Sequence, residues 1–318
     1  MYPSMIFNSD QKKRWLMKFS QFPKLSSMVI SFVFVVFLFI AGCSDQQTSG
    51  KNEQAASSPD EAVKIVYVDW ASERASANVV KAAIEQEMNR DCKIRAVSLV
   101  AMWQALAKGD QDGMVAAWLP SLQERFLEKH KQDVVNLGPN LKGTKIGIVV
   151  PGYVDINSIE ELKDHAPKFD HKIIGIDPHA GIMEKTEKAI EVYNLKEFEL
   201  ISGSGATMTT TLQNAIQEKR WIAVTGWTPH WKFAKWDLKY LEDPRNVFGE
   251  EEYIATFVRQ GLKEDKPEVY KFLDNFYWKT GDMEQVMLWA QDEDTSYQEA
   301  ARRWVDKNRE KVETWINN

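Results

Sequence analysis

The chain of 318 residues is poor in the side chains that usually mark a metal or catalytic site. It has two cysteines, Cys43 and Cys92, and five histidines without a His-x-x-x-His pair. The sequence also lacks a Gly-x-Ser-x-Gly nucleophile elbow and a phosphate-binding glycine loop. Because Cys43 is a predicted lipidation site, Cys92 stands alone, and neither a disulfide framework nor a cysteine metal site can form. We therefore expect no catalytic residues, no metal and no cofactor.

A hydrophobic run long enough to cross a membrane is missing as well. The run from Met28 to Ile40 has 13 apolar or small residues, whereas a membrane-spanning helix needs about 20. Five lysines and arginines precede it, between positions 12 and 24, and Ala-Gly-Cys follows it. This order is typical of a signal peptide rather than of an uncleaved membrane helix. Residues 40–43 also resemble a lipobox, which predicts a lipoprotein signal peptide at residues 1–42 and a lipidated N-terminal Cys43.

The chain after this leader lacks an excess of positive charge. It has 35 basic and 45 acidic residues, a net charge of −10. Such a balance argues against binding to nucleic acid and against electrostatic attachment to an anionic membrane surface. Residues 43–61 are polar without apolar periodicity and predict a lipidated tether. The natural start stays open between Met1 and Met17, because the segment from Met17 is already a sufficient basic start for a signal peptide.

Strand-like and helix-like segments alternate along the remainder. Short runs rich in β-branched residues predict strands at 63–70, 92–100, 144–151, 171–177, 198–204, 220–227 and 253–261. Apolar residues recur at helical spacing between them, as in 72–89, 122–130, 181–194 and 208–219, and the segments at 267–278, 283–291 and 296–316 predict helices only. This alternation predicts an α/β architecture with parallel sheets. The order predicts two lobes, formed by 62–152 plus 253–318 and by 153–252.

Six sequence blocks carry a family resemblance that periodicity does not supply. In order they are "VDWASERASANVV", "AAWLP", "KIGIVVPGYVDINSIEELK", "IIGIDPHAGIMEKTEKAI", "VTGWTPHWKFAKWDLKYLEDP" and "VFGEEEYIATFVRQG". They resemble the glycine betaine/proline betaine substrate-binding proteins of ABC importers over essentially the whole chain after the leader. The resemblance implies a type II periplasmic-binding-protein fold, in which two α/β lobes with a hinge close on a ligand. It also implies an extracytoplasmic, membrane-anchored protein whose partners are an ABC permease and its ATPase.

The same resemblance implies a cage of aromatic rings for a quaternary ammonium ligand. A trimethylammonium group has no N–H donor, so the faces of electron-rich rings are left to hold it. Each ring contributes about 0.5–1 kcal/mol when exposed and ~2 kcal/mol or more when water is excluded. The matching residues are Trp70, Trp118 and Trp227. All three are expected at or just after strand carboxyl ends, where open α/β sheets place ligands, although a tryptophan without such a match is more often a core residue.

The other end of a betaine is a carboxylate. The resemblance implies that the backbone amides of Gly181 and Ile182 hold it, at a predicted helix start where free amides and the helix dipole suit an anion. Two positions depart from the family pattern. Gln123 replaces a histidine that reaches the carboxylate, and His179 replaces a glycine. Glutamine can donate a hydrogen bond but carries no charge, so we hypothesise that His179 supplies the missing donor; the alternative is an exposed loop residue.

Other functions have to be weighed against this one. Asp69, Glu73, Asp177 and Asp237 fall near the predicted cleft, which leaves a carbohydrate-active enzyme as an alternative. No pair of them has a meaningful spacing, and Glu73 is better explained as a cap of the first helix. Among binding proteins, glycine betaine is the expected zwitterionic ligand. Choline, carnitine, proline betaine and dimethylsulfoniopropionate are the alternatives, and a protein that feeds a sensor rather than a permease has the same sequence signature.

Overall fold

The structure is a computed structural model that describes residues 61–317. All described residues belong to one compact unit by their contacts. The predicted signal peptide, the lipidation site Cys43 and the tether up to residue 60 lie outside the described residues. Within residues 61–317, no helix combines the length and the apolar character needed to cross a bilayer.

The first of two connected sheets, sheet A, has the strand order β2-β1-β3-β9-β4. β1 pairs in parallel with β2 and β3, whereas β9 runs antiparallel to both β3 and the first part of β4. The prediction of parallel sheets was therefore wrong for the strand that returns late in the sequence. The strands are β1 (Val63–Val68), β2 (Cys92–Val97), β3 (Gly113–Leu119), β4 (Val134–Pro151) and β9 (Glu252–Arg259).

Sheet B shares the strand β4 with sheet A. β4 pairs with β9 as far as Thr144 and with β7 from Lys145 onward, so one strand passes through both sheets. β7 and β8 are antiparallel to β4, and β5 pairs in parallel with β6 and β7. The remaining strands are β5 (Lys172–Ile174), β6 (Glu199–Ile201), β7 (Ala223–Thr228) and β8 (Leu238–Tyr240).

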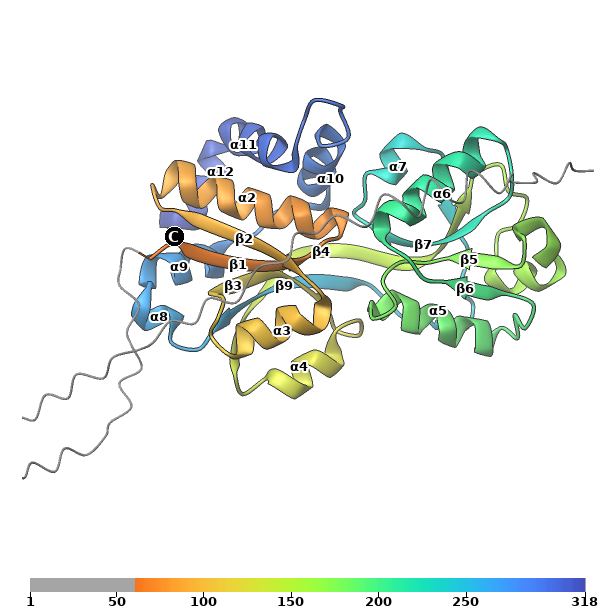
Figure 1. The fold of residues 1–318 in the computed structure, drawn as a ribbon, viewed down its shortest axis with the longest axis horizontal. Coiled ribbons are helices and arrows are strands. Elements are labelled where there is room, and N and C mark those ends of the chain that lie inside the picture. Colours follow the sequence, from red (N-terminus) through yellow and green to blue (C-terminus); the bar gives the residue numbers. More distant parts are fainter. Residues whose placement is uncertain (1–60, 318) are drawn as a thin grey trace, which may run out of the picture. The chain divides into compact units, whose positions relative to one another are not determined.

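Helices cover both faces of sheet A (Figure 1). α2 contacts β1, β2 and β3 on one face and is itself covered by α10, α11 and α12, while α3 contacts β1, β3 and β9 on the other face and packs on α4. α9 contacts β4, β9 and α12. The helices are α2 (Ala71–Glu87), α3 (Leu99–Ala107), α4 (Glu124–His130), α8 (Leu262–Asp265), α9 (Pro267–Asn275), α10 (Thr280–Trp289), α11 (Tyr297–Lys307) and α12 (Arg309–Asn317).

Sheet B is covered in the same way, with α5 on one side and α6 and α7 on the other (Figure 1). α5 contacts β4, β6 and β7. Two short 3-10 helices, η2 (Ile159–Asp164) and η3 (Ala166–Phe169), precede β5. The helices are α5 (Gly181–Val192), α6 (Gly205–Gln217) and α7 (Lys232–Lys235).

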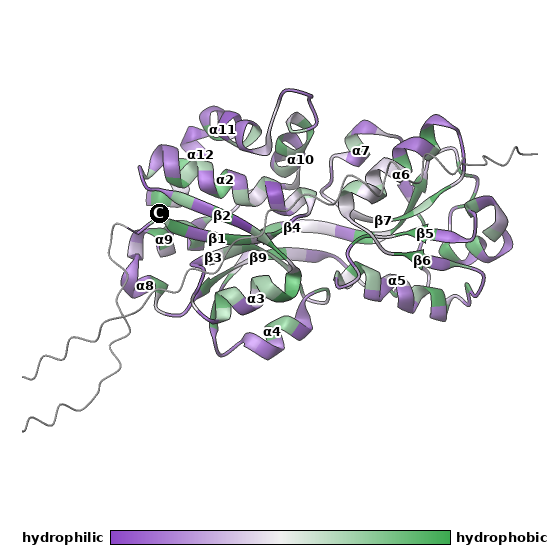
Figure 2. Ribbon diagram, viewed as in Figure 1, coloured by the Kyte–Doolittle hydropathy of each residue, from purple (hydrophilic) through white to green (hydrophobic). Residues whose placement is uncertain are grey.

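The hydropathy of the strands follows their place in the sheet. β1 lies between two strands and is hydrophobic, whereas its neighbour β2 lies at the edge and is hydrophilic for much of its length (Figure 2). Lys93 and Arg95 belong to β2, and Ile65 and Val66 of β1 are fully buried. Charged side chains on an edge strand discourage pairing with another chain.

Two predicted segments differ most from the structure, and the strand β3 was not predicted at all. The strand expected from position 144 begins at Val134, because Gly138 and Pro139, which usually end a strand, are accommodated as irregularities in the pairing with β9. The helix expected over 296–316 is two helices, α11 and α12. They separate at Asn308, whose φ of −126° is not helical and whose amide side chain donates to the carbonyl oxygen of Trp304 at 2.8 Å. A side chain that bonds the preceding turn competes with helix continuation.

Candidate ligand-binding site

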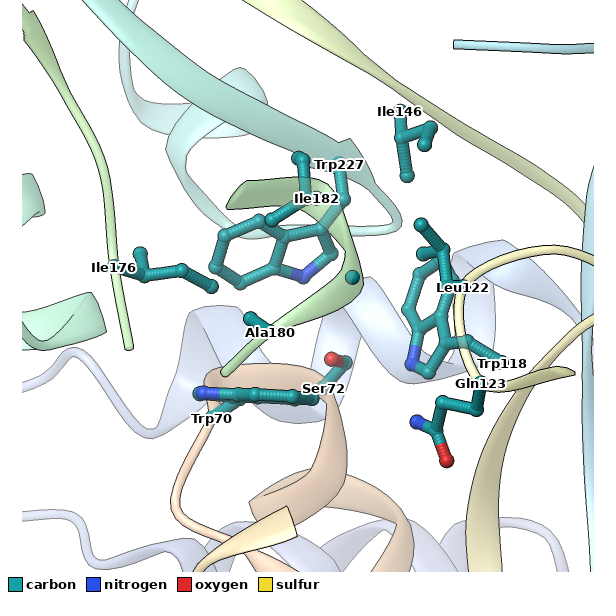
Figure 3. A pocket seen from close by; sticks show the side chains of 11 residues that line it. Trp70, Ser72, Trp118, Leu122, Gln123, Ile146, Ile176, Ala180, Ile182 and Trp227 are labelled. Atoms are coloured by element: carbon teal, nitrogen blue, oxygen red, sulfur yellow. The ribbon is translucent and has the colours of Figure 1, made fainter. Parts of the chain in front are cut away.

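Three tryptophans from three strand ends line one cavity (Figure 3). Trp70 follows β1 and is the N-cap residue of α2, Trp118 is the penultimate residue of β3, and Trp227 is the penultimate residue of β7. Their exposed fractions are 8%, 4% and 5%. The first two belong to the sheet A side and the third to sheet B, so the cavity is formed between residues from both sheets.

The remaining lining of the cavity is almost entirely apolar. The other lining residues are Ser72, Leu122, Gln123, Ile146, Ile176, Ala180, Gly181 and Ile182. No charged side chain is among the lining residues in this described part of the chain. The free volume between these side chains is about 30 Å³, so they lie close around it. A cationic ligand in this cavity would therefore meet ring faces rather than a carboxylate.

A buried carboxyl group holds the ring of Trp118. Its indole Nε1–H donates to Oε1 of Glu73 at 2.7 Å. Glu73 is 1% exposed, and its Oε2 has no hydrogen-bond partner among the described residues. Burial raises the pKa of Glu73 well above its ordinary value, with the hydrogen bond from Trp118 acting in the opposite direction. The expected role of Glu73 as a helix cap was wrong, because α2 has no side-chain cap hydrogen bond.

Other groups support the ring of Trp227. The His230 ring meets it edge to face, with ring centroids 4.7 Å apart, and the ammonium nitrogen of Lys232 lies 4.3 Å from the Trp227 centroid. Burial, and secondarily the neighbouring Lys232, lowers the pKa of His230 well below its ordinary value. The neutral His230 ring accepts the backbone N–H of Lys232 at Nδ1, at 3.1 Å. His230 therefore fixes the turn after β7 without lining the cavity.

The first two residues of α5, Gly181 and Ile182, lie at the cavity as predicted. The first N–H groups of a helix have no partner inside it, and the N-cap residue Ala180 makes no side-chain cap hydrogen bond. A Cβ atom added at Gly181 would lie 2.8 Å from Cα of Leu122 and closer still to its carbonyl oxygen. Glycine is therefore required for the approach of α5 to the segment after β3, and the free amides suit an anion there.

Neither Gln123 nor His179 is placed to act as the expected hydrogen-bond donor to a ligand carboxylate. Gln123 borders the cavity, but its amide points away from the space between the three rings (Figure 3). Its Oε1 accepts Nε1–H of Trp103 at 2.9 Å and its Nε2 donates to the carbonyl oxygen of Ala116 at 3.2 Å. His179 is exposed and is not among the lining residues, and its carbonyl oxygen accepts a hydrogen bond from Arg125 at 3.3 Å. This placement matches the alternative of an exposed loop residue.

Two polar residues at the site, Ser72 and Lys232, were missed by the sequence reasoning, and a third, Glu73, was placed near the cleft but given a different role. The hydroxyl of Ser72 lies between the rings of Trp70 and Trp118 in Figure 3 and has no hydrogen-bond partner among the described residues. Glu73 and Lys232 do not line the cavity but contact its rings. Ser72 lies two positions after Trp70, and Lys232 lies in the "TPHWK" segment, so proximity to the tryptophans was the available signal.

The chain is similar to known proteins in sequence and in fold. The family model described as "Substrate binding domain of ABC-type glycine betaine transport system" (OpuAC) matches residues 61–307. A curated relative, the glycine betaine/carnitine transport binding protein GbuC of Listeria monocytogenes, is 50% identical over 157 residues. That match spans 49% of this chain and about half, 52%, of the relative.

Solved structures match over a longer range. The lactococcal OpuAC, crystallised in its closed-liganded conformation with glycine betaine, is 45% identical with a TM-score of 0.77, covering 81% of this chain and all of that chain. The glycine/betaine/L-proline-binding protein ProX of Borrelia burgdorferi is 40% identical with the same TM-score, covering 81% and 97%. A choline-binding protein at 23% identity and TM-score 0.74 shares the fold. These matches confirm the predicted type II periplasmic-binding-protein fold.

The matched proteins are binding proteins of transporters, so the alternative of a carbohydrate-active enzyme is set aside and the chain is not an enzyme. In this chain, three tryptophans surround a cavity whose lining includes no charged side chain among the described residues. The N-terminus of a helix lies at the edge of that cavity. The chain belongs to the family of substrate-binding domains of ABC-type glycine betaine transport systems.

Proposed function

We propose that the protein captures glycine betaine, or a related quaternary ammonium solute, in a cage formed by Trp70, Trp118 and Trp227. The observation that carries this proposal is the meeting of the three indoles at one cavity whose lining includes no charged side chain within residues 61–317. An onium group needs no hydrogen-bond partner and is stabilised by ring faces, by ~2 kcal/mol or more per ring when water is excluded. The solved relative with glycine betaine bound supports the same ligand class.

The carboxylate of the ligand is assigned to the N-terminus of α5. The amides of Gly181 and Ile182 are free to donate, and the positive end of the helix dipole adds an attraction for an anion. Gln123 is a poor candidate for the further donor, because its amide points away from the rings and is held by Trp103 and Ala116. The unpartnered hydroxyl of Ser72 is the better candidate, since it is buried and lies at the cavity.

The proposed biological role is delivery of this ligand to an ABC permease and its ATPase for osmoprotection. The two predicted lobes, 62–152 plus 253–318 and 153–252, would close on the ligand, with β4 and β9 as the connections between them. The location is outside the cytoplasm, and the anchor is a lipid on Cys43. Labelling with a palmitate analogue should tag the wild type and not Cys43→Ser. A wild type that stays unlabelled would contradict the anchor.

Calorimetric titration of the protein tests the ligand. Glycine betaine, proline betaine, carnitine, dimethylsulfoniopropionate and choline form the panel, and 3,3-dimethylbutanoate, the uncharged-carbon isostere of glycine betaine, is the control. We expect glycine betaine to bind and the isostere to bind at least about tenfold more weakly, because replacing nitrogen by carbon removes the cation. Equal binding of the two compounds would contradict the proposed aromatic cage, and binding of choline alone would make choline the ligand.

A further inference from the structure

Lys232, the first residue of α7, is an unusual lysine. It is fully buried, and its ammonium lies 4.3 Å from the ring centroid of Trp227 and 5.6 Å from that of Phe233. Among the described residues its nitrogen has no hydrogen-bond partner. Removing an ammonium from water without a paired group is costly, so the two aromatic rings are the main compensation that the structure provides.

The ammonium and the cavity lie at the same indole. Trp227 lines the cavity, whereas Lys232 is not among the lining residues. Because Lys232 sits over the Trp227 ring without reaching the cavity, we infer that it covers the ring face turned away from the ligand. A cation on one face of the Trp227 ring weakens the attraction of the ring for a cation on the other face. The Lys232 ammonium and a ligand cation this close also repel each other in a site that excludes water.

We propose that Lys232 is a specificity-determining residue whose ammonium opposes a cationic group on the cavity face of Trp227, so that ligand affinity depends on the protonation of Lys232. This inference rests on the proposed function. A zwitterion has no net charge and is repelled less than a pure cation of the same size. The ammonium therefore favours a betaine over choline, and removing its proton weakens that preference.

The groups around Lys232 allow this protonation to change near neutral pH. Burial lowers the pKa of Lys232 to about 7. His230, in the turn before α7, has its own pKa lowered and stays neutral, and Lys235 on α7 is exposed. Tyr240 on β8, which stacks on Phe233, has its pKa raised by burial and stays neutral, and burial raises the pKa of Glu284 on α10.

A second titratable group contacts the cage and has to be separated from Lys232. Glu73, hydrogen-bonded to Trp118, has a raised pKa, and its ionisation would also attract a cation as the pH rises. The two groups act with the same sign, since one loses a positive charge and the other gains a negative one. Substituting each residue separately shows how much of the pH dependence of ligand binding comes from Lys232 and how much from Glu73.

The test is calorimetric titration of the whole protein with glycine betaine and with choline at about pH 6 and about pH 8, in two buffers of different ionisation enthalpy. We expect each ligand to bind more tightly at the higher pH, by about tenfold for choline, which is ~1.4 kcal/mol, and by less for glycine betaine. Near pH 7, binding should release part of a proton, because the ligand lowers the pKa of Lys232 further. Binding without proton release or pH dependence would overturn this inference and leave the proposed function intact.

Three variants assign the effect. Lys232→Met keeps most of the side-chain volume and removes the charge, so its affinity at pH 6 should rise toward the wild-type value at pH 8 and lose most of its dependence on pH. Lys235→Met, on the same helix, should behave as wild type. If Glu73→Gln abolishes the pH dependence and Lys232→Met does not, the role belongs to Glu73. Circular dichroism checks that each variant folds. If Lys232→Met does not fold, the proton release on binding is compared between the wild type and Glu73→Gln, and release that persists in Glu73→Gln assigns the effect to Lys232. Absence of binding by every onium ligand would instead overturn the proposed function.

Discussion

Trp118 and Trp227 are the same side chain at the same cavity, but the protein supports them in opposite ways. Trp118, on β3 of sheet A, donates its indole N–H to the buried carboxyl of Glu73. Trp227, on β7 of sheet B, has an ammonium over its ring and a neutral histidine at its edge. The difference places a buried carboxyl beside one ring and a buried ammonium over the other, and in a low-dielectric interior a charge on either group would act strongly on the neighbouring ring.

The largest effect should come from removing the two rings. Trp227→Ala should weaken glycine betaine binding by about 100-fold or more, since it removes a ring contact and uncovers the Lys232 ammonium. Trp118→Ala should cost less, about tenfold, because the Glu73 carboxyl then faces the ligand's cation. Phenylalanine at either position should do less harm than alanine. Calorimetry measures the affinity of each variant, and circular dichroism checks its fold. Equal losses of affinity would contradict the proposed difference between Trp118 and Trp227, and unfolding would show that the rings are core residues.

The next effect concerns the contact between the two sides. Gly181→Ala should weaken binding by about tenfold or more, because a Cβ atom there overlaps the backbone of Leu122 and forces α5 away. The matched control is Gly205→Ala at the first position of α6, where an added Cβ meets nothing within 4 Å. Normal affinity of Gly181→Ala would show that this approach is not needed for ligand binding.

Glu73 offers a pH test of the Trp118 side alone. Because burial raises its pKa, folding keeps the carboxyl protonated after the unfolded chain has ionised. Stability from this group is complete below about pH 4.5 and is lost as the pH rises through the folded pKa, at ~1.4 kcal/mol per pH unit. Glu73→Gln keeps an acceptor for Trp118 and cannot ionise, so its stability should exceed that of wild type increasingly above pH 4.5. Denaturant unfolding at pH 4, 6 and 8 measures this; parallel pH profiles would refute it.

The smallest effect should come from the exposed ion pair between α4 and α5. Arg125 and Glu184 are 3.2 Å apart with side chains 51% and 63% exposed. Such pairs contribute about 0–1 kcal/mol and are screened by salt. Arg125→Ala should therefore raise the dissociation rate of the ligand by less than about fivefold, and less at high salt, in stopped-flow measurements. A larger, salt-independent change would make this contact part of the binding energy.

The sequence predicted the ring residues and the fold because both depend on local pattern or on family blocks. Apolar runs at strand spacing and helical spacing located most elements, and the blocks around Trp70, Trp118 and Trp227 gave the family that the comparisons confirm. The antiparallel return of β9 was missed, since strand direction in a sheet depends on where a distant segment inserts. The extension of β4 back to Val134 was missed because Gly138 and Pro139 disfavour a strand locally.

What the sequence determined by itself is which side chains the site has: three indoles, a glycine at a helix start, and a glutamine in place of a histidine. Only the tertiary structure decided how they act. Gln123 is turned from the cavity by Trp103, 20 positions away, and Trp118 is fixed by Glu73, 45 positions away. A buried polar group takes whichever partner the fold brings to it, because leaving it unpaired costs more than any local preference. Lys232 is the opposite case, because the fold buries its ammonium over the ring of Trp227 without a hydrogen-bond partner among the described residues, and this burial lowers its pKa to about 7.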